Sequence, residues 1–228
     1  MFSGFSADSD LDLVLIWDRD DLPSAQERPA HALCDADFAP RQNDGPAYAL
    51  DNLMVGGWAV DVASYTRACF EGWFAAVESS GGWRPNAWPL PLHAVAGFIY
   101  GQPLADPHGT GETIRTTRRV PPNSLATGAL DCLGRDLPVY AADLASAARR
   151  DDAWLFHALA SPLIKNAYVA WFASEGYYLP FPKHLNRWVE RFGLDQRQLQ
   201  LEKEIWSAPT LTRRRDAIIR FAENVLGT

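Results

Sequence analysis

The spacing of apolar residues changes near Pro121-Pro122, and this change most limits the folds open to the chain. Before it, apolar residues come in short runs such as residues 11–17, Leu-Asp-Leu-Val-Leu-Ile-Trp, which predicts a strand. After it, they recur three and four positions apart, which predicts amphipathic helices. The sequence therefore predicts an α+β fold, with strands and helices in residues 1–115 and an all-helical domain in residues 116–228.

Further elements are expected in the first part of the chain. Residues 54–64 (MVGGWAVDVAS) are expected to form a second strand, and residues 66–79 a helix. The segment between the two strands is rich in Pro, Asp and Ala, which predicts loop with some helix. Residues 102–106 are expected to form a short strand that leads into a turn.

Three features are expected to punctuate the helical part. Ser161-Pro162 should kink or split a long helix, Gly193 should end one, and Pro209 with Thr210 should start another. His157 lies among apolar residues, so we expect it in the core rather than at a metal.

Composition and charge make some binding partners of the protein, such as long nucleic acid, less favoured than others. The 228 residues carry a net charge of −7, but residues 1–65 carry −9 and residues 183–228 carry +3. An acidic N-terminal part repels a phosphate backbone, so long nucleic acid is an unlikely substrate. No apolar run approaches the ~18 residues that span a membrane. The three widely spaced cysteines predict reduced thiols and a cytoplasmic protein.

The motif with the most chemical meaning is the pair of acids Asp10 and Asp12 at the start of the first strand. Alternate residues of a strand point to one face, so both carboxylates should share a face while Leu11 and Leu13 face the other side. Their Cα atoms should be roughly 6.6 Å apart, two strand steps. Two carboxylates at this spacing can close on one divalent cation. The alternative is that these acids merely solvate a strand end.

This stretch resembles the DNA-polymerase-beta-like nucleotidyltransferases. That family carries Gly-Ser, then a Gly, a short loop and Ser-Asp-x-Asp-Leu; the matching residues here are Gly4 and residues 9–13, Ser-Asp-Leu-Asp-Leu. A third carboxylate of the family lies on a later strand between aliphatic residues, and Asp61 in Val-Asp-Val matches it. The resemblance implies a catalytic and metal site of Asp10, Asp12 and Asp61 that binds Mg²⁺ or Mn²⁺.

The resemblance also implies a reaction. A nucleoside monophosphate, AMP from ATP, would pass to an unknown small-molecule or protein acceptor by two-metal catalysis. Gly4 and Ser9 would contribute to nucleotide binding, and Lys183, whose backbone Pro180 and Pro182 could fix beside an aromatic pair, would face the triphosphate. The alternative for Lys183 is a solvated surface lysine. Lys165 is a second candidate. Residues 106–109 (Asp-Pro-His-Gly), 177–180 (Tyr-Tyr-Leu-Pro) and 182–185 (Pro-Lys-His-Leu) resemble bacterial members of the family, some of which adenylylate antibiotics. The resemblance implies a small mixed β-sheet core followed by an α-helical bundle.

The sequence departs from the family at its N-terminus. By the family's spacing, the Gly-Ser pair that holds the nucleotide phosphates would fall just before Met1, so we expect the true start to lie upstream. The alternative is a catalytically inactive member that serves as a binding or regulatory partner. A glycosyltransferase with a metal-binding Asp-x-Asp is less favoured, because that class needs a long domain before the motif.

Overall fold

The computed structural model describes residues 11–28, 30–38, 40–45, 48–79, 83, 91–183 and 185–227. By packing, the chain divides into two compact units, residues 1–74 and 75–228, and the division falls within helix α2. None of the helices in the described ranges is long and apolar enough to cross a bilayer.

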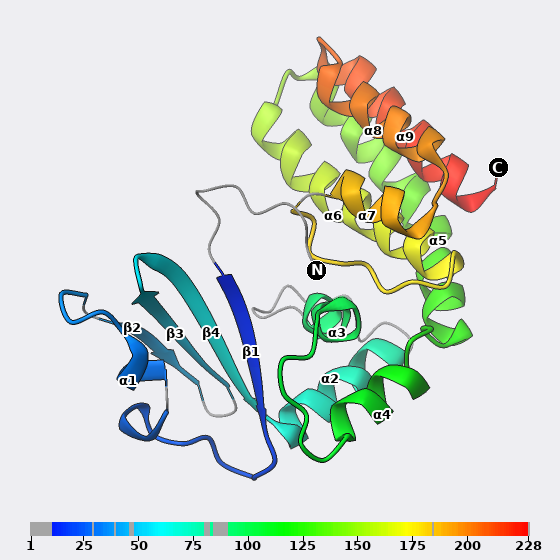
Figure 1. The fold of residues 1–228 in the computed structure, drawn as a ribbon. Coiled ribbons are helices and arrows are strands. Elements are labelled where there is room, and N and C mark those ends of the chain that lie inside the picture. Colours follow the sequence, from blue (N-terminus) through cyan, green and yellow to red (C-terminus); the bar gives the residue numbers. More distant parts are fainter. Residues whose placement is uncertain are drawn as a thin grey trace. The chain divides into compact units, whose positions relative to one another are not determined.

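Unit 1 is built on a four-stranded mixed sheet with the strand order β1-β4-β3-β2 (Figure 1). β1 runs parallel to β4, whereas β3 is antiparallel to both of its neighbours. The strands are β1 (Leu11–Trp17), β2 (Arg41–Asp44), β3 (Tyr48–Val55) and β4 (Trp58–Thr66). The predicted strand at residues 11–17 is therefore confirmed, with both of its ends.

The predicted strand at residues 54–64 is wrong in one respect, because a tight turn interrupts it. β3 ends at Val55 and β4 begins at Trp58, with Gly56 and Gly57 between them at φ of 57° and 80°. Two successive residues with positive φ form the two-residue hairpin turn that matches the twist of paired strands. The carboxylate of Asp35 accepts hydrogen bonds from both glycine N–H groups, at 2.8 and 3.0 Å.

One face of the sheet is covered by apolar side chains. Leu53, Val60 and Val62 are its buried centre, and Leu13, Leu15, Cys34 and Val55 pack around them. Because side chains alternate along a strand, the residues next to these point to the opposite face. The alternation in β4 thus buries Val60 and Val62 and leaves Asp61 between them on the other face.

A buried ion pair lies at one end of this covered face. The guanidinium of Arg28 donates from Nε and Nη2 to both carboxylate oxygens of Asp51, each at 2.8 Å, and from Nη2 to Asp44 at 2.9 Å. Asp51 is fully buried and Arg28 nearly so. Hydrogen bonding to Asp51, which outweighs the opposing effect of burial, raises the pKa of Arg28 above its ordinary value. The pair fixes the loop after β1 to the hairpin strands β2 and β3.

Helical segments complete unit 1. The predicted helix at residues 66–79 is confirmed as α2 (Arg67–Glu78). Phe70 and Phe74 on α2 are buried and meet edge to face, with ring centroids 5.3 Å apart. The segment expected to be loop with some helix does contain the short η1 (Ala25–Glu27) and α1 (Ala30–Leu33), but β2 and β3 lie there as well.

Unit 2 is helical. Helices α5, α6, α8 and α9 pack against one another as a bundle (Figure 1). Its apolar centre includes the fully buried side chains of Leu133, Leu144, Phe156, Phe172 and Phe221. The helices are α3 (Pro91–Tyr100), α4 (Thr110–Thr117), α5 (Asn123–Arg149), α6 (Ala153–Ser174), α7 (Leu185–Phe192), α8 (Gln196–Ser207) and α9 (Leu211–Leu226).

The predicted helix limits hold at two places. α7 ends before Gly193, whose φ is 66°, and Thr210 caps α9 by accepting a hydrogen bond from the N–H of Arg213 at 3.3 Å. Pro162 does not split its helix, because α6 continues through it. His157 is exposed rather than in the core, and its Nε2 lies 3.3 Å from Arg214.

The short strand predicted at residues 102–106 is wrong. These described residues form loop and bends, and the helices α3 and α4 before and after them were not predicted. The fold class is confirmed: the chain is α+β, with a small mixed sheet followed by a helical bundle. The predicted domains, residues 1–115 and 116–228, stay a prediction; the compact units of the structure are residues 1–74 and 75–228.

Candidate functional site

Two predicted site residues lie side by side in the sheet. Asp12 of β1 and Asp61 of β4 are partners in the register of the parallel pair. Partners on adjacent strands project to the same face, and neighbouring strands are about 4.8 Å apart. The two carboxylates therefore occupy adjacent positions on one face, although a long stretch of sequence separates them.

The third strand adds a polar side chain to the same row. Asn52 of β3 is the antiparallel register partner of Asp61. Its side-chain Nδ2 donates a hydrogen bond to Oδ1 of Asp61 at 2.6 Å. A row of Asp12, Asp61 and Asn52 thus runs across β1, β4 and β3, and we call these residues the carboxylate row.

Local sequence explains why the carboxylate row faces away from the apolar core. In β4, Val60 and Val62 are buried on either side of Asp61, and in β1, Leu13 packs on the same apolar cluster as these valines. A shift of one residue in either strand would put a carboxylate into that cluster, so burial sets the register. The apolar alternation therefore aligns the acids.

The row is accessible to solvent and ligands. Asp12 is exposed and Asp61 is partly buried. Two adjacent carboxylates repel each other, and a bound divalent cation removes that repulsion. Carboxylate oxygens are the ligands that Mg²⁺ and Mn²⁺ prefer in proteins, so the donor atoms of Asp12 and Asp61 fit such an ion.

Some of the predicted site residues lie outside the described residues. These are Gly4, Ser9 and Asp10. Within the described ranges, no group of three or more His, Cys, Asp or Glu side chains is arranged to hold a metal ion. The three-acid metal site therefore stays a prediction, of which the structure describes two acids and their shared row.

Lys183 lies in unit 2, in an exposed turn just before α7. Lys165 is partly buried in α6, and desolvation lowers the pKa of its ammonium group. Burial, together with the charge of Lys165, lowers the pKa of His93 to about 4, and the His93 ring meets Phe181 edge to face at 5.3 Å. The role of Lys183 in nucleotide binding stays a prediction.

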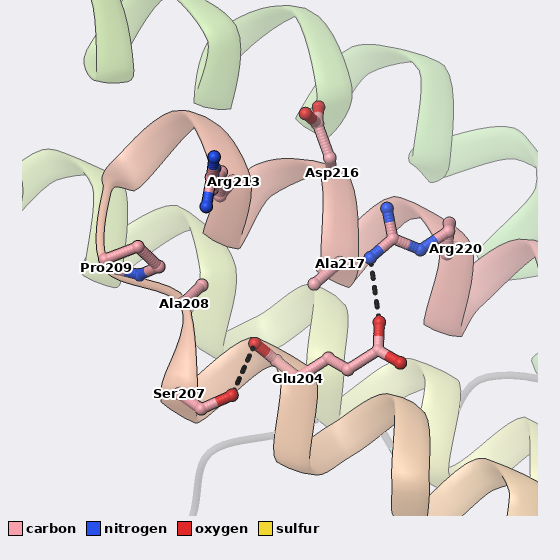
Figure 2. Close-up of a pocket in the computed structure, with 8 residues that line it drawn as sticks. All are labelled: Glu204, Ser207, Ala208, Pro209, Arg213, Asp216, Ala217 and Arg220. Carbon is pink, nitrogen blue, oxygen red and sulfur yellow. Dashed lines mark hydrogen bonds and ion pairs between the residues drawn. The ribbon is translucent and has the colours of Figure 1, made fainter.

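A separate hollow lies in unit 2 between α8 and α9, with a volume of about 330 Å³ (Figure 2). Two of its charged side chains pair with each other, since Nη2 of Arg220 lies 2.9 Å from a carboxylate oxygen of Glu204. Arg213 and Asp216 add one further charge of each sign. The lining is thus balanced in charge and does not favour an anionic or a cationic ligand.

Sequence reasoning missed Asn52. The signal that could have found it is the Gly56-Gly57 pair, which marks a hairpin turn and makes residues 48–55 a strand paired with residues 58–66. Counting outward from that turn places Asn52 opposite Asp61. Asn52 belongs to no sequence motif, and only the pairing of β3 with β4 identifies it as a neighbour of Asp61.

Comparison with protein-family models and with curated proteins finds no match for this chain. Among solved structures, it is similar to a nucleotidyltransferase-like protein from Exiguobacterium sibiricum 255-15. The two share 12% sequence identity with a TM-score of 0.44, and the match covers 79% of this chain and 57% of that chain. A likeness at this level does not assign a family, so the function proposed below is based on the residues of this chain.

Proposed function

We propose that this protein is a metal-dependent nucleotidyltransferase, which transfers AMP from ATP to a small-molecule or protein acceptor. The observation that supports it most is the register of Asp12 and Asp61, which puts two carboxylates of the predicted acidic set on one sheet face. Asp12 belongs to the Ser-Asp-Leu-Asp-Leu motif at residues 9–13 and Asp61 is its register partner, which agrees with the resemblance to DNA-polymerase-beta-like nucleotidyltransferases.

In this proposal Asp10, Asp12 and Asp61 hold Mg²⁺ or Mn²⁺. The ions would neutralise charge on the triphosphate and increase the acidity of the acceptor hydroxyl. Asp61, being adjacent to the activated oxygen, would accept the proton of that hydroxyl. The acceptor oxygen then bonds to the α-phosphorus as the bond to the β-phosphate oxygen breaks, and pyrophosphate leaves. Positioning and charge neutralisation account for most of such catalysis.

Transfer of label from [α-³²P]ATP tests the proposal directly. The protein is incubated with Mg²⁺ and a panel of hydroxyl- and amine-bearing small molecules and of proteins, and labelled products are separated. We expect an acceptor-dependent product and release of pyrophosphate, with Asp12→Asn and Asp61→Asn reducing the rate at least about a hundredfold. Asp20→Asn is the matched control, because Asp20 is an exposed carboxylate outside the carboxylate row.

Lys183 is tested in the same assay. We propose that its ammonium group binds the triphosphate, so Lys183→Ala should raise the KM for ATP about tenfold, as loss of a charge-assisted hydrogen bond would. Lys203→Ala is the control, since Lys203 is an exposed lysine on α8. Magnesium-dependent ATP binding with no transfer to any acceptor would instead favour the inactive, regulatory alternative.

A further inference from the structure

The hydrogen bond between Asn52 and Asp61 has a chemical consequence for a cation at the carboxylate row. We propose that Asn52 is a positioning residue, which fixes the carboxylate of Asp61 so that its second oxygen can bind the divalent ion shared with Asp12. This inference rests on the proposed function and names a residue that acts through Asp61 rather than on the substrate.

The chemistry of the two groups fixes the direction of the hydrogen bond. An ionised carboxylate only accepts, so Asn52 must present its NH₂ group, and the 2.6 Å distance from Nδ2 to Oδ1 is short for such a bond. Hydrogen bonds to a charged acceptor are about twice as strong as those between neutral groups. The bond restricts rotation of the carboxylate, and Oδ2, which takes no part in it, can coordinate the ion.

An amide suits this position better than a cationic donor. Arg or Lys would also donate to Asp61, but its positive charge would cancel the carboxylate and repel a divalent ion. Asn is neutral, so it restrains Asp61 while keeping the negative charge that attracts the cation. The carboxylate row thus combines two acids with one neutral donor.

A purely structural role explains this asparagine less well. β3 and β4 are already paired by their backbone ladder from Tyr48 to Val55, and Asn is disfavoured in strands. Asp61 is only partly buried, so water could satisfy its oxygens without help from Asn52. The side chain of Asn52 is therefore needed neither to pair the strands nor to satisfy the oxygens of Asp61. Its remaining role is to orient the carboxylate of Asp61.

The test measures Mn²⁺ affinity by isothermal titration calorimetry without nucleotide, so it does not depend on transferase activity. Asn52→Leu keeps the approximate volume of the side chain and removes its donor. We expect its Kd for Mn²⁺ to rise at least about tenfold, the range seen when a group supporting a metal ligand is removed. Its Tm should stay near that of the wild type, and Asn186→Ala, at an exposed asparagine of α7, should leave both values unchanged.

A second measurement on the wild-type protein covers the case in which Asn52→Leu does not fold. The side-chain ¹⁵N–H₂ signals of Asn52 should shift during a Mg²⁺ titration, with the same midpoint as the metal binding measured by calorimetry. Absence of any shift at saturating Mg²⁺ would overturn the proposal.

The outcomes separate this inference from the proposed function. If wild-type protein binds Mn²⁺, Asp61→Asn abolishes that binding and Asn52→Leu binds as tightly as wild type, only the role of Asn52 is wrong. If wild-type protein binds no Mn²⁺, the proposed metal-dependent function itself fails. A weaker affinity confined to Asn52→Leu and the aspartate variants supports both.

Discussion

Asp12 on β1 and Asp61 on β4 lie side by side on one face of the sheet, as direct partners in the register of two parallel strands. Parallel neighbours cannot be joined by a tight turn, so the intervening chain must cross over before β4 can lie beside β1. Here that chain forms β2 and β3 on its way. The row of polar side chains is therefore a product of sheet topology.

The turn at Gly57 sets the alignment of β3 with β4. Its φ is 80°, and no atom lies within 4 Å of a Cβ added there, so any penalty for a side chain comes from the backbone alone. Gly57→Ala should lower the free energy of unfolding by about 1–2 kcal/mol, the cost of a left-handed conformation for an L-residue.

Gly72 in α2 is the matched control, since a Cβ there also meets nothing within 4 Å and its φ is not positive. Gly72→Ala should raise the free energy of unfolding by about 0.5–1 kcal/mol. Urea unfolding followed by circular dichroism measures both. Equal effects of the two substitutions would show that the turn conformation does not limit stability.

The buried ion pair of Arg28 with Asp51 should be sensitive to loss of one partner. Arg28→Met leaves the fully buried Asp51 without its bidentate donor, and we expect a loss of about 3–5 kcal/mol in the free energy of unfolding. The double variant Arg28→Met/Asp51→Leu should recover much of that loss, because no uncompensated charge remains in the interior.

Arg67 serves as the comparison for that experiment. It pairs with Asp18 and Glu71 at the surface, so Arg67→Met should cost no more than about 1 kcal/mol. Chemical denaturation of the three variants gives the ranking. An Arg28→Met variant as stable as Arg67→Met would contradict the importance of the buried pair.

The lowered pKa of His93 predicts that the stability of the folded protein depends on pH. Burial, with the charge of Lys165, holds its pKa at about 4 in the folded protein, against the ordinary value of 6.5. Between these pH values the unfolded chain binds a proton that the folded chain does not. The free energy of unfolding should therefore be unaffected by His93 above pH 6.5 and should fall as the pH drops from 6.5 towards 4.

Other groups titrate in the same range, so the comparison between variants carries the test. His93→Gln should flatten the dependence of Tm on pH in this interval relative to the wild type. Parallel slopes for His93→Gln and wild type would show that His93 is protonated normally in the folded state.

The sequence predicted the elements whose signals are local. β1 is an apolar run with polar flanks, and the C-terminal helices have clear periodicity. β3 was missed because its alternation buries Asp51 alongside Ala49 and Leu53. A buried aspartate reads as a surface residue until its partner Arg28 is known, and that contact is visible only in three dimensions.

In the candidate site, too, local sequence signals predicted some residues, and contacts between strands revealed the other. Asp12 and Asp61 were predicted together from a motif and a resemblance, and the register places them as partners. Asn52 was not predicted, because a single strand over residues 54–64 places the Gly56-Gly57 pair inside the strand, whereas the structure has a turn there. A misread turn removes every cross-strand relationship that depends on it.

The measurement that most directly tests the account is paramagnetic broadening of backbone amide signals by Mn²⁺. One ion shared by Asp12 and Asp61 should broaden the signals around both residues, on β1 and on β4, with one common midpoint in the titration. Asp12→Asn or Asp61→Asn should weaken the broadening on both strands, and Asp20→Asn should not. Broadening centred away from β1 and β4, or unchanged in both aspartate variants, would contradict a shared metal site.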